Sequence, residues 1–138
     1  MKEELDVLTK NHTWDLVTLP FGQSVISCKW IYKIKTRSDG SIERYKARLV
    51  AKGFTQEYGI DYEGTFAPVD CISSVHALLA VAAASKWDLF QMDVKNAFLN
   101  GELSEESYMQ PPSSLSIDSN KICHIRRALY GLKQAPRA

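Results

Sequence analysis

The chain has 138 residues, of which 45% are hydrophobic, and its 17 Lys and Arg against 16 Asp and Glu give a formal net charge of +1. This length and apolar content suffice for one domain with a core, or for part of a larger one, and exclude intrinsic disorder. Three widely spaced cysteines exclude a disulfide framework and a zinc ribbon. The N-terminus has no signal-peptide apolar core, and the longest apolar stretch, residues 75–84, is too short to span a bilayer, so we expect a soluble intracellular protein.

The near-neutral total hides a segregation of charge along the chain. Residues 29–53 contain eight Lys and Arg and two acids, residues 54–108 contain nine acids and two bases, and residues 121–138 contain five bases and no acid. Such alternation suits a protein with a path for a polyanion beside an acidic site. Ordinary solvated strand faces are the alternative interpretation, and charge alone leaves it open.

Three local patterns organise much of the first half of the chain. Residues 3–8 have apolar positions at roughly helical spacing, which predicts a short helix that ends near Asn11. Residues 13–20 alternate and stop at a proline, which is typical of a short edge strand. Residues 58–70 are rich in Gly, aromatic and acidic residues, and we expect them to form a connector that lies over a surface.

Residues 26–53 contain the clearest local signal, two β-rich runs that flank Asp39 and Gly40. Asp-Gly is a strong signal for a tight turn, so the sequence predicts a β-hairpin. Charged and apolar residues alternate in its first arm. Because successive side chains of a strand point to opposite faces, we expect Lys33 and Lys35 on one face.

The middle of the chain predicts a helix followed by a strand. From Ser73 or Ser74, either of which suits an N-cap, the sequence is Ala- and Leu-rich as far as Trp87. This segment is apolar nearly all round, so we expect a helix buried against a sheet. Residues 88–94 alternate and predict a strand with Asp93 near its C-terminal end.

The last part of the chain predicts two further strands. Residues 106–112 indicate a short strand broken by two prolines, and residues 113–120 a loop. Residues 121–138 indicate a strand, a Gly-containing turn and the opening of a helix after Pro136. Because no closing turn or cap follows, we expect a truncated domain.

Asp93 is the first candidate for chemistry. An acid at the end of a central strand is held rigidly and suits a hard divalent cation. Two-metal phosphoryl or nucleotidyl transfer needs several carboxylates around ions roughly 4 Å apart, so one acid is not enough. A surface or turn-capping aspartate is the alternative interpretation.

Long ordered strings connect this sequence to one family: TWDLVTLPFG, CKWIYKIK, DGSIERYKARLVAKGFTQEYGIDYEGTFAPV, WDLFQMDVKNAFLNGEL, YMQPP and ALYGLKQAPRA. Over essentially its whole length the chain resembles the reverse transcriptase domain of Ty1/copia-type LTR retrotransposons. The resemblance implies an α+β fold, the fingers plus the first half of the palm of a right-hand polymerase, with an antiparallel sheet and packed helices. It divides residues 1–138 into a fingers-like part, about 1–70, and a fingers/palm part, about 71–138, with the first catalytic strand at 88–94.

The same resemblance implies an RNA-directed DNA polymerase that transfers deoxynucleotides to a primer 3′-hydroxyl by two-metal catalysis. Asp93 matches the first metal-binding aspartate, and the backbone carbonyl of Val94 the further ligand, for two Mg²⁺ ions or Mn²⁺. Ala97 and Phe98 fall at nucleotide-binding positions. Phe98 matches the aromatic residue that packs beneath the sugar and excludes a 2′-hydroxyl, because a rigid ring rejects an added oxygen by volume. Core packing is the alternative for Phe98.

In the hairpin, Lys46 and Arg48 are the best matches to the cations that close over the triphosphate in reverse transcriptases. A lysine offers a point charge and an arginine a bidentate fork, and the sequence does not decide which of the two reaches the phosphates. Lys52 is a weaker candidate. The alternative for these side chains is cross-strand pairing with Glu43.

The string YGLKQAP matches the motif whose turn and following helix contact template and nucleotide. Here Tyr130, Gly131 and Lys133 are the candidate template/primer contacts, with Gly131 allowing close backbone approach and Lys133 contacting a backbone phosphate. His76 stands where the family commonly has a basic residue, and we interpret it as a partly exposed helix residue without a catalytic role.

One departure from the family is an absence, since no adjacent pair of aspartates occurs in the sequence. We therefore expect a chain without the C-terminal palm, thumb and RNase H regions that is inactive alone. The family implies an RNA or DNA template-primer and deoxynucleoside triphosphates as partners, no membrane, and a cytoplasmic (virus-like particle) or nuclear location. The alternatives are a non-catalytic nucleic-acid-binding remnant and a degenerate element fragment without function.

Overall fold

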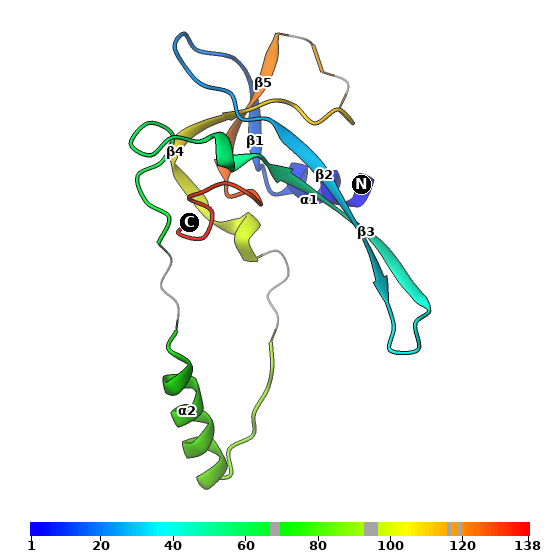
Figure 1. The fold of residues 1–138 in the computed structure, drawn as a ribbon, viewed down its shortest axis with the longest axis vertical. Coiled ribbons are helices and arrows are strands. Elements are labelled where there is room, and N and C mark those ends of the chain that lie inside the picture. Colours follow the sequence, from blue (N-terminus) through cyan, green and yellow to red (C-terminus); the bar gives the residue numbers. More distant parts are fainter. Residues whose placement is uncertain (67–69, 93–96, 116, 119) are drawn as a thin grey trace.

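The computed structural model describes residues 1–138 except 67–69, 93–96, 116 and 119, together with the side chain of every described residue but 98 (Figure 1). The helices are α1 (Lys2–Lys10) and α2 (Ile72–Ala84), with short 3-10 turns η1 (Gly53–Thr55) and η2 (Ala97–Asn100). The strands are β1 (Trp14–Thr18), β2 (Cys28–Thr36), β3 (Ile42–Ala51), β4 (Glu102–Met109) and β5 (Lys121–Arg127). Two antiparallel sheets and few helices give the α+β class that was expected.

Strands β1, β5 and β4 form one sheet in that order, so β1 is an edge strand as its alternation predicts. Directly opposed residues of an antiparallel pair share one face. Cys123 of β5 is opposed by Leu16 of β1 and by Met109 of β4. Because Cys123 and Met109 are fully buried, this face of the sheet looks into the core.

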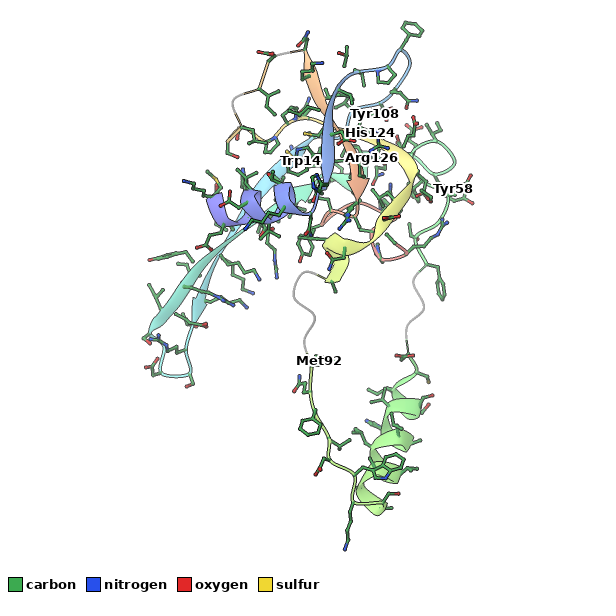
Figure 2. The ribbon with its side chains drawn as sticks, turned by 180° about the vertical axis from the view of Figure 1, so that it is seen from behind. Trp14, Tyr58, Met92, Tyr108, His124 and Arg126 are labelled. Atoms are coloured by element: carbon green, nitrogen blue, oxygen red, sulfur yellow. The ribbon has the colours of Figure 1, made fainter. Side chains whose placement is uncertain are left out.

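The opposite face of the three-stranded sheet carries polar and aromatic side chains. His124 stacks on Tyr108 with ring centroids 4.9 Å apart, and Arg126 donates a hydrogen bond of 2.7 Å to Asp15 (Figure 2). These contacts join all three strands across the sheet. β4 starts at Glu102, earlier than the strand expected at 106–112, because its ladder with β5 already includes that residue.

Strands β2 and β3 form the expected hairpin. The carboxylate of Asp39 accepts hydrogen bonds from the backbone N–H of Ser41 at 2.9 Å and from its hydroxyl at 2.7 Å. Gly40 has φ +83°, a conformation that glycine adopts at no steric cost. The hydroxyl of Ser41 also lowers the pKa of Asp39. The Asp-Gly signal therefore identified the turn correctly.

The core lies where the base of the hairpin meets the three-stranded sheet. Ile26 connects the two sheets, since its N–H donates to the carbonyl of Tyr108 at 2.8 Å and its carbonyl accepts from Gln110 at 2.9 Å. Helix α1 contributes Leu8, which is fully buried. The buried apolar cluster consists of Leu8, Ile26, Leu49, Ala51, Leu99, Met109, Cys123, Ile125, Ala128, Leu129, Leu132 and Ala135.

Helix α2 differs from its prediction in two respects. It begins at Ile72 after Cys71, so neither serine serves as the N-cap. It is also not buried against a sheet, because Leu78 is 63% exposed and Ala82 is the only buried residue of the helix. In Figure 1 the helix lies away from both sheets. An apolar helix is buried only where another element offers a matching surface, and the described part of the chain provides none.

The strand expected at 88–94 is not present where the structure describes it. Residues 88–92 have no strand assignment, and Phe90 and Met92 are 91% and 87% exposed. A strand needs a partner for its hydrogen-bond ladder, and residues 88–92 pair with no described strand. The remaining residues of this prediction, 93 and 94, lie outside the described residues.

The C-terminal residues form turns instead of the helix expected after Pro136. The N–H groups of Arg137 and Ala138 both donate to the carbonyl of Gln134, at 2.9 and 3.3 Å, so the segment curls back over a single turn. Leu132 and Ala135 of this segment belong to the core cluster. Leu132, Gln134 and Ala135 thus anchor this segment in the body of the molecule, whereas Gly131 and Lys133 are exposed.

Candidate functional site

The hairpin carries one strongly basic surface, which we call the cationic face. Side chains alternate between the two faces of a strand, and directly opposed residues share a face. In the observed register Lys33 is opposed by Lys46, Lys35 by Arg44, and Ile31 by Arg48. The cationic face consists of Lys33, Lys35, Arg44, Lys46 and Arg48. The structure therefore confirms that Lys33 and Lys35 lie together.

The cationic face contains two directly opposed pairs of like charge. Cross-strand pairs of like charge destabilise a sheet, so these side chains need a counter-charge. Arg44 has Glu43 at 3.9 Å, with both side chains exposed, a geometry that contributes little. Lys46 and Arg48 take part in no ion pair among the residues that the structure describes. The pairing of these two cations with Glu43 is thus not observed.

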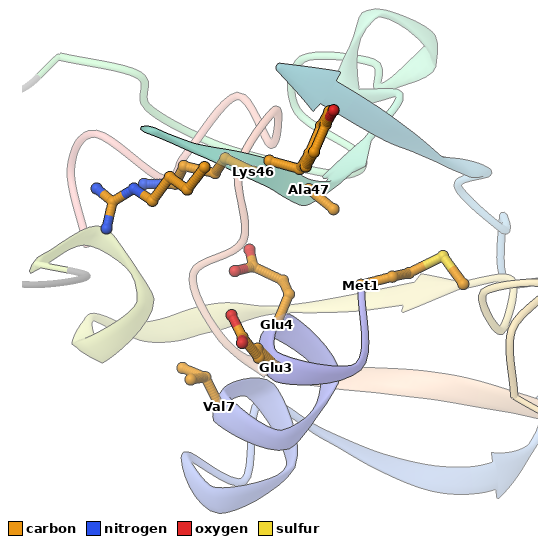
Figure 3. A pocket seen from close by; sticks show the side chains of 8 residues that line it. Met1, Glu3, Glu4, Val7, Lys46 and Ala47 are labelled. Carbon is orange, nitrogen blue, oxygen red and sulfur yellow. The ribbon is translucent and has the colours of Figure 1, made fainter. Parts of the chain in front are cut away.

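The first turn of α1 places acids next to β3 (Figure 3). Glu3 and Glu4 line a cavity of about 180 Å³ together with Lys46 and Arg44. Burial raises the pKa of Glu4, an effect that the charges of Lys46 and Arg48 oppose. Oε1 of Glu4 is buried without a hydrogen-bond partner. Glu4 is therefore a poorly solvated counter-charge next to the cationic face.

The turn at Tyr130 and Gly131 lies against the base of β3. The guanidinium of Arg48 is 5.3 Å from the ring centroid of Tyr130, a cation–π contact. The N–H of Ala51 donates to the carbonyl of Tyr130 at 2.7 Å. The fold therefore brings together a predicted nucleotide-binding residue and a predicted template contact that are far apart in the sequence.

Gly131 permits this contact by its lack of a side chain. Its φ is +92°, and a Cβ atom there would lie 2.2 Å from the carbonyl oxygen of Ala51. The backbone of Gly131 thus approaches β3 closely, whereas the approach to template or primer that was expected of Gly131 stays a prediction. A Cβ on Gly53 would in turn lie 2.1 Å from the carbonyl oxygen of Gly131. Two glycines thus let the turn and the end of β3 touch.

A buried amide network, which no sequence motif indicated, holds the same turn. Oε1 of Gln56 accepts the N–H of Lys133 at 2.9 Å, and Nε2 of Gln56 donates to Oε1 of Gln134 at 3.1 Å. Nε2 of Gln134 donates to the hydroxyl of Ser107, also at 3.1 Å. Both glutamines lie within the strings quoted above, but nothing local in a sequence shows that two distant amides meet.

The remaining predicted site residues are not joined to this surface by the described contacts. Asp93 and Val94 lie outside the described residues, as does the side chain of Phe98, while Ala97 is exposed in η2. Lys52 is half-buried beyond the end of β3. Within the described ranges, no group of three or more His, Cys, Asp and Glu residues could hold a metal ion.

Comparison with known proteins identifies the family. Residues 11–138 match the family model described as reverse transcriptase (RNA-dependent DNA polymerase). The match covers nearly the whole chain, and the chain therefore belongs to this family.

Several relatives of the chain are transposon polyproteins. It is 50% identical, over its whole length, to a retrovirus-related Pol polyprotein from transposon RE1 of Arabidopsis thaliana, and 46% identical over 99% of its length to that from transposon TNT 1-94 of Nicotiana tabacum. The Gag-Pol polyprotein of transposon Ty1-ER2 of Saccharomyces cerevisiae is 29% identical over 96% of the chain. The chain spans 10% of each plant polyprotein and 8% of the yeast one.

No solved structure matches the chain. No helix among the described residues is long and apolar enough to cross a membrane.

Proposed function

We propose that the chain forms the fingers and the first half of the palm of a copia-type RNA-directed DNA polymerase, in which the cationic face binds the phosphates of the incoming deoxynucleoside triphosphate or of the template-primer. The observation that carries this proposal is the set of cations on one face of the hairpin. The two opposed pairs of like charge repel each other in the free chain. A bound polyanion would offset this repulsion. Family membership supplies the class of ligand.

Arg48 and Lys46 have different tasks in this proposal. Arg48 lies against Tyr130, which restricts its guanidinium and favours a bidentate contact with phosphate oxygens. Lys46 is half-buried and adjacent to the cavity at α1, so its ammonium acts as a point charge. Both lie on one face of β3, which allows them to contact neighbouring phosphates.

The catalytic part of the proposal rests on sequence. Asp93 and the carbonyl of Val94 would hold divalent metal, which when bound neutralises charge on the reacting phosphate. Ala97 and Phe98 would bind the nucleotide, with Phe98 excluding a 2′-hydroxyl. Because the sequence contains no adjacent aspartates, we propose that this chain alone does not extend a primer. Mg²⁺-dependent extension by the purified chain that Asp93→Ala abolishes would contradict this last point.

Binding of a labelled single-stranded oligonucleotide, followed by anisotropy at several salt concentrations, tests the phosphate-binding role. Each phosphate contact contributes about 0.7 to the slope of log affinity against log salt concentration for a single strand. The double variant Lys46→Ala/Arg48→Ala should bind more weakly and with a slope smaller by about 1.4, the loss of two such contacts.

The matched control is Arg126→Ala, which removes an exposed cation from the outer face of the three-stranded sheet. It should leave the slope unchanged, since Arg126 lies away from the cationic face and already contacts Asp15 at 2.7 Å. A slope smaller by about 0.7 in this control, half the change in the double variant, would show that binding follows total charge and would refute the proposed site.

A further inference from the structure

We propose that Gln56 is a positioning residue, which holds the turn of residues 130–134 so that Lys133 extends the cationic face. The inference rests on the proposed function for its ligand, a nucleic-acid phosphate. It concerns a residue that makes no contact with that ligand itself, because Gln56 is only 7% exposed.

The geometry of the network supports a positioning role. The side-chain amide of Gln56 uses both ends, accepting from the N–H of Lys133 at 2.9 Å and donating to Gln134 at 3.1 Å. Gln134 in turn donates a hydrogen bond to Ser107 of β4, and these two residues are 1% and 3% exposed. The backbone of Lys133 is thereby tied to β4 through buried groups.

The energetics of buried amides favour one arrangement of the turn. An amide that loses its partner in the interior incurs the full desolvation cost, whereas a fully satisfied network specifies a single geometry. The close contacts of Gly131 with Ala51 and of Gly53 with Gly131 also restrict the position of the turn. The position of the turn relative to β3 is therefore determined at several points.

Lys133 is the residue on which this arrangement acts. Its side chain is exposed, whereas its N–H is engaged by Gln56. The same turn carries Tyr130, whose ring contacts Arg48 of the cationic face. A cation that is anchored by its backbone loses less conformational freedom on binding a phosphate than one on a mobile loop.

A double-mutant cycle tests the inference with the oligonucleotide used above. Gln56→Met keeps the length of the side chain and removes the amide. It should weaken binding and lower the salt slope by about 0.7, because Lys133 is no longer positioned to contact its phosphate. Lys133→Ala should have the same effect, because it removes that contact directly. The double variant Gln56→Met/Lys133→Ala should match Lys133→Ala alone, because Gln56 acts only through Lys133.

Two controls separate positioning from stability. Cys123→Ala removes a buried side chain from β5 in the middle of the three-stranded sheet, and it should lower stability without changing the slope. Gln56→Asn retains an amide but is one methylene too short to reach Lys133, so it should reproduce Gln56→Met if the methionine variant does not fold. Hydrogen exchange of the unsubstituted chain adds a third readout, in which the amide of Lys133 should be protected to the level of the core.

The outcomes distinguish the inference from the proposed function. A salt slope that stays unchanged in a folded Gln56 variant, additive effects in the double variant, or fast exchange of the Lys133 amide would overturn the inference. The proposed function would still stand if Lys46→Ala/Arg48→Ala lowered the slope. If that double variant had no effect, the proposed function would fail, and protection of the Lys133 amide would show only that the turn is rigid.

Discussion

The packed body of the molecule and its outlying segments differ in ways that their composition does not suggest. The body consists of α1, the three-stranded sheet, the base of the hairpin and residues 130–135, whereas α2 and the hairpin tip are outlying. Helix α1 is rich in charge yet buries Leu8 completely, while α2 is almost wholly apolar and buries only Ala82. The local sequence therefore predicted that both segments are helical, and contacts determined which one is packed.

The largest contrast is expected from one substitution made in both helices. Leu8→Ala should lower the free energy of unfolding by about 2–5 kcal/mol, because it removes a buried side chain and leaves a cavity. Leu78→Ala in α2 should change it by less than about 0.5 kcal/mol, because that side chain is 63% exposed. Urea unfolding of the two variants measures both values. Similar losses would show that α2 is packed in solution.

A second pair compares a glycine of the body with one of the hairpin tip. Gly131→Ala should cost about 3 kcal/mol, the sum of left-handed strain and a clash with the backbone of β3. Gly40→Ala has a similar φ but nothing within 4 Å of the added Cβ, so it should cost only about 1–2 kcal/mol of strain. Thermal or urea unfolding distinguishes them. Equal losses would indicate that the turn at Gly131 moves aside freely.

The contact between the body and the cationic face can be tested at Tyr130. Its contact with Arg48 should appear as a coupling of about 0.5–1 kcal/mol in a double-mutant cycle of unfolding between Tyr130→Leu and Arg48→Ala. Tyr130→Phe retains the ring and should retain the coupling. Coupling that vanished with Phe would assign the interaction to the hydroxyl group instead of the ring.

The smallest effect concerns Glu4, at the boundary of α1 and β3. Burial raises the pKa of Glu4, so the folded chain binds this proton more tightly than the unfolded chain, and stability falls as pH rises through the raised pKa. Glu4→Gln should remove this loss of stability. At neutral pH the free energy of unfolding should rise by less than about 1 kcal/mol, because the carboxyl group is only partly buried. It should also tighten oligonucleotide binding, since a negative charge near Lys46 and Arg48 disappears.

Glu3→Gln is the matched control for that substitution, because it removes an exposed acid from the same helical turn. The difference in unfolding free energy between the two variants should shrink as pH falls and Glu4 becomes protonated in both states. A difference that persisted at acid pH would contradict the assignment of the effect to the ionisation of Glu4. Urea unfolding measured at several pH values provides the comparison.

The hairpin, α1 and β1 were predicted correctly, because their signals lie in neighbouring residues. The hairpin followed from Asp39-Gly40 and alternation, and α1 and β1 from spacing and a terminating proline. The expected burial of α2 and the expected strand at 88–94 were wrong for the described residues, because both required partners that a pattern does not reveal. The assignments of Asp93, Val94 and Phe98 remain predictions.

By itself, the sequence determined the family, the positions of the hairpin and its turn, and the alternation that places Lys33 and Lys35 on one face. These depend on neighbouring residues and on long ordered strings. Only the tertiary structure decided that Arg48 meets Tyr130, that Gly131 touches β3 and that Gln56 holds Lys133. The physical reason is that hydrogen bonds and ring contacts act over a few ångströms in space, whereas Gln56 and Lys133 are separated by 77 positions along the chain.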